Sequence, residues 1–214
     1  MKATAIVPVK RFAEAKRRLA AGLDDERRVA VVAAMLEDTL EAIAAARSVE
    51  RTVVVSGDPR AQEIVAAGGA AEILPDPADE GHVVAALAGI ARAEVDGSGC
   101  VVLLPGDCPL LDPKEIDGLL TGVPSSYVAI VPDRHGTGTN ALVLAPPGAI
   151  EPAFGEGSRE RHVAAARAAG VPYAVEEVPS LALDLDTPAD LVALTTALEG
   201  GRGRARRTAR ALGI

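Results

Sequence analysis

Aromatic side chains are scarce in this 214-residue sequence, which has no tryptophan and an aromatic share of only 2%. Because the hydrophobic share is nevertheless 49%, the core must be built from alanine, valine, leucine and isoleucine. A chain of this length is ample for one large α/β domain. We expect a single domain over residues 1–200, followed by a basic, flexible tail over residues 201–214.

Basic residues are fewer than acidic residues, which gives a net charge of −8 and a pI near 5.0. An acidic chain is a poor electrostatic match for nucleic acid, so we expect no nucleic-acid partner. An anionic substrate would need a local basic cluster or a cation. Because no long apolar run or secretory leader is evident, we expect no membrane contact and a cytoplasmic location. Cys100 and Cys108 are interpreted as small, reduced core residues.

Two glycine-rich motifs are missing. GxxxxGK[ST] does not occur, which excludes a P-loop, and the absence of GxGxxG argues against a dinucleotide cofactor. A nucleotide, if bound, must be held in another way.

Short apolar, β-branched stretches alternate with segments of helical periodicity along the chain. This alternation predicts an α/β fold with a mostly parallel, mixed sheet and helices on both faces. The predicted strands are 4–9, 51–56, 71–76, 100–105, 127–133, 139–146 and 173–179, and the predicted helices are 24–46, 59–69, 81–95, 112–123, 158–170 and 187–200. Ligands bind such sheets beyond the carboxyl ends of the strands, where Lys10, Ser56, Asp107 and Asp133 fall.

Three carboxylates stand out against their apolar surroundings. Asp107 follows the strand that ends in CVVLLP, and Asp184 and Asp186 interrupt the stretch LALDLDTPADL. On a strand, Asp184 and Asp186 would project from one face and repel each other unless a cation lay between them. Mg²⁺ prefers such hard oxygen ligands and bridges them to phosphates. Two alternatives remain open: Asp186 caps the following helix, and Asp107 forms an Asx turn.

A basic loop follows the first strand in the stretch PVKRFAEAKRRL, where Lys10, Lys16 and Arg18 lie close together. In an acidic protein this local excess is where a triphosphate could dock, with point charges and backbone N–H groups. A solvated surface loop is the alternative.

Two small-residue segments offer anion sites. DRHGTGTNAL places Gly136 and Gly138 beside threonine hydroxyls, and FGEGSRERH places Gly155, Gly157 and Ser158 before a predicted helix. An ordinary glycine-rich turn is the alternative for each segment. His135 and His162 are expected to be exposed, because no nucleophile is paired with either.

These stretches together resemble the 2-phospho-L-lactate or phosphoenolpyruvate guanylyltransferases of coenzyme F-420 biosynthesis. The resemblance is carried by PVK with the following AKRRL, by LPGDCPLL, DRHGTGTNAL, FGEGSRERH and LDLDTPADL, and it runs from about residue 4 to residue 195. It implies a Rossmann-like nucleotidyltransferase fold, related to that of the molybdopterin guanylyltransferases. It also implies an enzyme that joins GMP from GTP to a small phosphorylated acid and releases pyrophosphate.

The resemblance assigns roles to particular residues. It implies that Asp107, Asp184 and Asp186 are the catalytic residues and hold Mg²⁺, and that Thr139, Gly155 and Ser158 bind the acceptor. The GTP phosphates would meet the N-terminal loop through Pro8, Val9, Lys10, Lys16 and Arg18. Family members commonly carry a Leu-Asn pair before the third helix, where this chain has Val83 and Val84, so this segment does not fix the donor base.

Several alternatives remain open from the sequence. The acceptor is phosphoenolpyruvate, 2-phospho-L-lactate or 3-phosphoglycerate, which differ by a few atoms. A nucleotidyltransferase acting on molybdopterin or a sugar phosphate, and a non-catalytic nucleotide-binding module, share the same fold logic. A homodimer is compatible with the sequence, which does not fix the oligomeric state.

Overall fold

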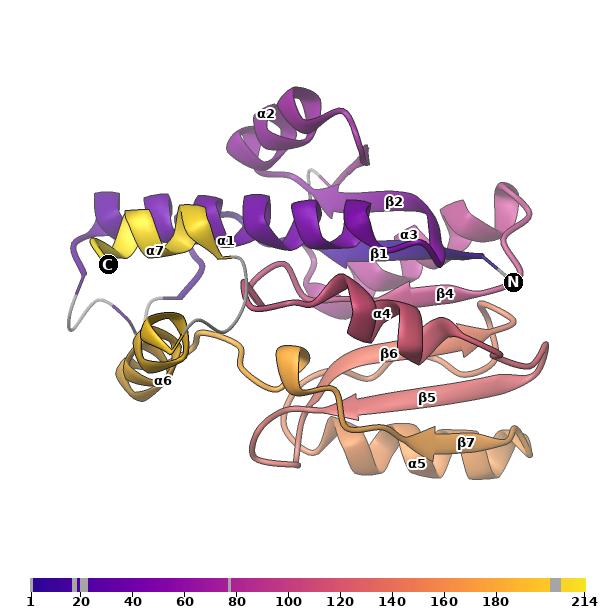
Figure 1. Ribbon diagram of the computed structural model, residues 1–214. Coiled ribbons are helices and arrows are strands. Elements are labelled where there is room, and N and C mark those ends of the chain that lie inside the picture. The colour runs from indigo at the N-terminus through magenta and orange to yellow at the C-terminus, as the bar shows by residue number, and fades with distance from the viewer. Residues whose placement is uncertain (1, 17–18, 20–22, 77, 201–204) are drawn as a thin grey trace.

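The computed structural model describes residues 2–16, 19, 23–76, 78–200 and 205–214. Seven strands form one sheet in the order β3-β2-β1-β4-β6-β5-β7 (Figure 1). The strands are β1 (Ala3–Pro8), β2 (Val49–Ser56), β3 (Glu72–Pro75), β4 (Val101–Leu103), β5 (Tyr127–Pro132), β6 (Thr139–Ala145) and β7 (Tyr173–Val175). The helices are α1 (Asp25–Ala45), α2 (Pro59–Gly68), α3 (His82–Val95), α4 (Pro113–Leu120), α5 (Ser158–Ala169), the 3-10 turn η2 (Pro179–Leu181), α6 (Pro188–Glu199) and α7 (Arg206–Leu212).

The sheet is mixed, as predicted. β1 pairs in parallel with both β2 and β4, whereas β6 runs antiparallel to its neighbours β4 and β5. The chain moves outward from β1 to β2 and β3, and then returns to the other side of β1 as β4. A crevice for ligands therefore opens between the ends of β1 and β4, where the winding changes direction. Because β6 is antiparallel, its first residue, Thr139, lies at this same edge.

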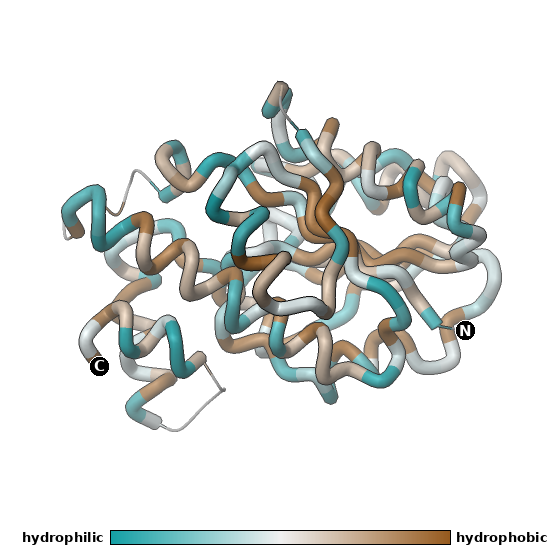
Figure 2. The backbone as a smooth tube through the Cα atoms, turned by 90° about the horizontal axis from the view of Figure 1, so that it is seen from above, coloured by the Kyte–Doolittle hydropathy of each residue, from teal (hydrophilic) through white to brown (hydrophobic). Residues whose placement is uncertain are grey.

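Each face of the sheet has its own apolar layer. Val102 and Leu104 pack on the face covered by α1 and α4, and Val101 and Leu103 pack on the face covered by α3 and α5 (Figure 1). This alternation follows from the two-residue period of a strand. Figure 2 shows the hydrophobic strands running through the centre between mixed helices. Cys100 and Cys108 are free and buried, as predicted.

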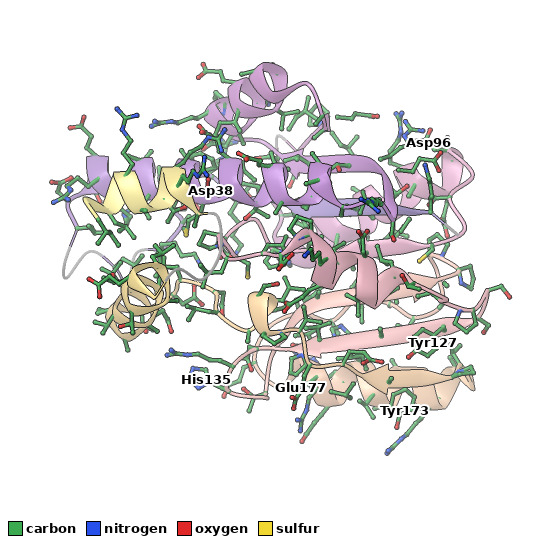
Figure 3. The ribbon with its side chains drawn as sticks, viewed as in Figure 1. Asp38, Asp96, Tyr127, His135, Tyr173 and Glu177 are labelled. Carbon is green, nitrogen blue, oxygen red and sulfur yellow. The ribbon has the colours of Figure 1, made fainter. Side chains whose placement is uncertain are left out.

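The C-terminal segment differs from the predicted flexible tail. Residues 205–214 include the helix α7, which lies along α1, while residues 201–204 lie outside the described ranges. Thr208 donates to the buried carboxylate of Asp38 from both its backbone nitrogen and its hydroxyl, each at 2.8 Å (Asp38 is labelled in Figure 3). Arg207 pairs with Glu37 and Glu41 on the same helix face. Arg207 and Thr208 thus dock this segment on an acidic face of α1, which the run of like charges alone did not reveal. Within the described ranges, no helix combines the length and apolar character that crossing a bilayer requires.

Candidate active site

A cavity of about 410 Å³ opens at the β1–β4 crevice. Its walls come from six places: the loop after β1, the end of β4 with the turn after it, the start of β6, the start of α3, the loop before α5 and the segment before α6. The lining residues are Lys10, His82, Val83, Leu103, Leu104, Pro105, Asp107, Thr139, Asn140, Phe154, Gly155 and Asp184. Five of the predicted site residues are therefore brought together from distant parts of the chain: Lys10, Asp107, Thr139, Gly155 and Asp184.

Lys16 lies at the centre of the acidic side of this site. Its ammonium forms ion pairs with both Asp107 and Asp186. Burial alone would lower the pKa of Lys16, but the carboxylates of Asp107 and Asp186 outweigh burial and raise that pKa above its usual value. Lys16 therefore carries a full positive charge at neutral pH and holds Asp107 and Asp186 side by side.

Two buried side chains, Arg28 of α1 and Asp58 at the start of α2, hold the loop that presents Lys16. Arg28 of α1 donates to the carbonyl oxygens of Phe12 and Ala13, each at 3.1 Å, and also to that of Ala15. Asp58, which caps α2, accepts from the backbone nitrogen of Phe12 at 2.8 Å. Arg28 and Asp58 together therefore fix the backbone of the loop from the side of α1 and α2. Lys16 itself has a φ of 57°, a backbone conformation that costs energy outside glycine and often marks a functional position.

Asp184 and Asp186 lie on irregular backbone, so the prediction that they share one face of a strand is wrong. Hydrogen bonds from side chains hold this segment instead of a strand ladder. Asn140 of β6 donates to the carbonyl of Leu181 at 2.7 Å and to the carboxylate of Asp184 at 3.4 Å. Leu185 is buried between the two acids and anchors them from the core side.

Asp190 fixes the position of Asp186. Its carboxylate accepts from the backbone nitrogens of Asp186 and Thr187 at 3.1 and 2.6 Å, and it pairs with Arg134 at 2.6 Å. Thr187 is the N-cap of α6 in a capping box with Asp190, which excludes Asp186 as the cap. Burial alone would raise the pKa of Asp190, but the bonds from Thr187 and Asp186 and the charge of Arg134 lower it below its usual value.

Burial and repulsion among the three acids both act on the pKa of Asp184. Burial first, and then the charges of Asp107 and Asp186, raise the pKa of Asp184 above its usual value, despite the opposing charge of Lys16. Among the described residues, the ion pairs that offset these carboxylates are those of Lys16 with Asp107 and Asp186, and such a cluster of acids attracts a further cation.

The donor set fits a magnesium ion chemically, because carboxylate oxygens are its preferred protein ligands. As the side chains stand, no three His, Cys, Asp or Glu residues within the described ranges form a group placed to hold a metal ion. The Lys16 ammonium stands between Asp107 and Asp186 instead. A metal at these acids therefore requires Lys16 to move aside, and the assignment of Mg²⁺ to these residues stays a prediction.

Of the residues predicted to bind the acceptor, Thr139 and Gly155 line the cavity, whereas Ser158 is not among its lining residues. Thr139 begins β6, and Gly155 has a φ of 107°, which glycine adopts without strain. Ser158 is the first residue of α5, is fully buried, and its hydroxyl has no hydrogen-bond partner within the described structure. Peptide N–H groups at the start of a helix favour an anion. Of the GTGT segment, Thr139 lines the cavity, while the backbone of Thr137 bonds to Asp133 and Arg159.

The remaining predicted residues fall at the same edge with one exception. Pro8 ends β1 and is buried, Val9 follows it half-buried, and Lys10 is exposed and lines the cavity. Arg18 lies outside the described ranges. Val83 lines the cavity and Val84 is 42% exposed.

Sequence reasoning misjudged one residue of the site and missed others. His162 is fully buried, so its predicted exposure is wrong, whereas His135 is exposed as predicted and stands at the edge of the molecule in Figure 3. His82 and Phe154 also line the cavity, with their rings edge to face at 4.8 Å. The signal that could have found Phe154 is rarity, since the chain has only two phenylalanines.

Comparison with known proteins agrees with this geometry. The family model described as "Guanylyl transferase CofC like" matches residues 3–214. The chain belongs to this family. It is therefore a nucleotidyltransferase enzyme, as the resemblance implied.

Curated relatives of this CofC-like chain are similar over nearly their whole length. A phosphoenolpyruvate guanylyltransferase of Conexibacter woesei is 46% identical over 97% of this chain and 94% of its own. One from Sphaerobacter thermophilus is 42% identical over 89% of this chain and 91% of its own.

Solved structures share the fold. A protein of Desulfovibrio desulfuricans, described as a nucleotide-diphospho-sugar transferase, aligns with a TM-score of 0.75 at 17% identity over 98% of this chain and 95% of its own. A nucleotidyl transferase of Methanothermobacter aligns with a TM-score of 0.68 at 17% identity, over 94% of this chain and 99% of its own. The Rossmann-like nucleotidyltransferase fold is thus confirmed.

Proposed function

We propose that this chain transfers GMP from GTP to phosphoenolpyruvate, and that this reaction serves coenzyme F-420 biosynthesis. The observation that carries the proposal is the placement of Asp107, Asp186 and Lys16 in one ionic cluster beside a cavity that Thr139 and Gly155 also line. The relatives named phosphoenolpyruvate guanylyltransferase support the choice of donor and acceptor.

In the proposed reaction, an oxygen of the acceptor's phosphate attacks the α-phosphorus of GTP. A bond forms between that oxygen and the α-phosphorus, and the bond from the α-phosphorus to the oxygen bridging it to the β-phosphate breaks. Pyrophosphate leaves with the electron pair. An ionised phosphate is already a nucleophile, so no side-chain base is needed, and catalysis consists of positioning and charge neutralisation.

The residues of this chain divide that work between two walls. Lys10 and Lys16, on the loop after β1, would neutralise the triphosphate, and the peptide N–H groups of that loop would hold its oxygens. Thr139, Gly155 and the start of α5 would orient the acid end of the acceptor. A Mg²⁺ held by Asp107, Asp184 and Asp186 would supply charge neutralisation where the two phosphates meet. Lys16 would then turn from these acids to the phosphates.

The test is purified protein with GTP and Mg²⁺, supplied separately with phosphoenolpyruvate, 2-phospho-L-lactate and 3-phosphoglycerate. We expect pyrophosphate release that depends on the acceptor and a product with the mass of GMP joined to phosphoenolpyruvate. The same assay with ATP, CTP and UTP tests the donor base beside Val83. If none of the three acid acceptors supported pyrophosphate release, the proposed function would be contradicted.

A matched set of variants tests the roles of the carboxylates. Asp184→Asn and Asp186→Asn should lower turnover by about two to four orders of magnitude, a size typical for loss of a main electrostatic contribution. The control is Asp112→Asn, the same chemical change at the N-cap of α4, where Asn caps as well as Asp does. Near-normal turnover of Asp186→Asn would show that these acids do not hold the metal.

A further inference from the structure

His162 connects the start of β6 with the segment before Gly155, and both segments border the cavity. It lies on α5 with its side chain fully buried. Its Nδ1 lies 3.0 Å from the hydroxyl oxygen of Thr139, and its Nε2 accepts from the backbone nitrogen of Ala153 at 2.8 Å. The edge of its ring contacts Phe154, with ring centroids 5.5 Å apart. One ring therefore holds Thr139 on β6 and the segment that leads into Gly155.

These two contacts fix where the proton of the imidazole lies. A peptide N–H can only donate, so Nε2 must offer a lone pair to Ala153. A neutral imidazole carries one N–H, which must then be on Nδ1. Burial first, and then the positive charge of Arg161, lower the pKa of His162 to about 4, so the ring is neutral in the physiological range. The contact with Thr139 is thus a hydrogen bond from Nδ1–H to the threonine oxygen.

This direction constrains the hydroxyl of Thr139. The oxygen accepts from His162, so the hydroxyl hydrogen cannot point at Nδ1, which carries a hydrogen of its own. Thr139 lines the cavity and retains 9% exposure. Accepting one hydrogen bond also polarises the hydroxyl and strengthens it as a donor. A threonine hydroxyl that is free to rotate would have no such preference.

We propose that His162 is a positioning residue that presents the Thr139 hydroxyl as a hydrogen-bond donor to an anionic oxygen of the acceptor. This inference rests on the proposed function and adds a determinant of acceptor recognition to it. His162 does not touch the acceptor or the reacting phosphates; it acts through Thr139 and through the backbone of Ala153.

Two substitutions separate the two hydrogen bonds of the ring. In His162→Gln, the amide oxygen reaches the position of Nε2 and still accepts from Ala153, while the donor to Thr139 is lost. In His162→Asn, the amide nitrogen occupies the position of Nδ1 and still donates to Thr139, while the bond to Ala153 is lost. A purely structural role would make both variants fail alike, so a difference between them is diagnostic.

We expect these substitutions to change KM for the acceptor and to leave KM for GTP unchanged. His162→Gln should raise KM for phosphoenolpyruvate by about five- to tenfold, the value of one hydrogen bond, with KM for GTP unchanged. His162→Asn should keep KM for phosphoenolpyruvate within about twofold of the parent and should lower Tm, because the Ala153 bond is lost. In a Thr139→Val background, His162→Gln should change KM for the acceptor no further, since the two residues act as a unit.

Two results would overturn the inference. The first is an acceptor KM in His162→Gln equal to that of the parent. The second is an acceptor KM in the double variant that rises by the product of the two single-variant increases, for His162→Gln and Thr139→Val. If His162→Gln does not fold, nitrogen-15 NMR of the parent protein reports the protonation state of the His162 ring. A charged ring, or a neutral ring with its proton on Nε2, would contradict the inference. Failure of the parent to use any of the three acceptors would instead refute the proposed function, so the two failures are distinguishable.

Discussion

Replacing Lys16 with Met tests whether this lysine and a divalent cation compete for the same carboxylates. Lys16→Met keeps the length and apolar body of the side chain and removes the charge that lies between Asp107 and Asp186. In protein without metal, the two acids then repel each other with no ammonium beside them. The fold should therefore be less stable, and the acids should bind Mg²⁺ more tightly.

The magnitude follows from the exposure of the three side chains. Breaking a fully buried ion pair costs about 3–5 kcal/mol. The side chain of Lys16 is only 10% exposed, but those of Asp107 and Asp186 are 27% and 51% exposed, so solvent screens much of the interaction. We expect about 1–2 kcal/mol, which for a chain of this size lowers Tm by about 2–8 °C. The same energy corresponds to Mg²⁺ binding about five- to thirtyfold tighter.

Thermal unfolding in EDTA and calorimetric titration with Mg²⁺ measure both quantities. The comparison variant is Lys10→Met, which removes the same charge from the same loop at an exposed position and should change neither value much. Turnover should fall in both variants, because both lysines face the phosphates in the proposed reaction. If Lys16→Met bound Mg²⁺ no more tightly than the parent, Lys16 would not occupy the place of the metal.

Three further predictions concern the support of the site. Asp190→Ala removes the capping box and the bonds that hold Asp186, so the free energy of unfolding should fall by about 1–2 kcal/mol in denaturant titration, and turnover should fall as well. Asp184→Asn should raise Tm in EDTA at neutral pH, because the raised pKa of Asp184 means that its ionisation destabilises the fold as pH rises through that pKa. This gain should vanish in unfolding scans as pH falls toward the usual value of 3.8, and an equal gain at all pH values would contradict the assignment. Asp38→Ala should lower stability by about 1–3 kcal/mol with KM for both substrates unchanged, because it leaves Thr208 without its partner far from the cavity.

Local patterns predicted the fold well, because each element is encoded by its own residues. Val101 to Leu104 form a continuous apolar run that is buried on both faces, and Pro113 and Pro188 open helices after the capping residues Asp112 and Thr187. The approximate location of the site followed from the same logic, since a parallel strand delivers whatever follows it to one edge of the sheet.

The details of the site depended on contacts between distant residues, which no local pattern encodes. Asp184 and Asp186 have strand-like spacing, yet a bond from the distant Asn140 to Asp184 and a local bond from Asp186 to Asp190 hold them on irregular backbone. His162 sits among charged residues in the sequence, and its burial becomes evident only once Thr139 and Ala153 are seen around it. Long-range polar partners override local periodicity at both places.

The docking of α7 on α1 completes, late in protein synthesis, the contacts of the helix that also holds the N-terminal loop. Arg28, which holds that loop, lies on the same helix as Asp38, and the partners of Asp38 are Arg207 and Thr208. The ribosome makes these partners about 170 residues after Asp38, as their sequence separation shows. A nascent chain that lacks them carries a bare acid on α1, so this helix gains its full set of contacts only after α7 has been made.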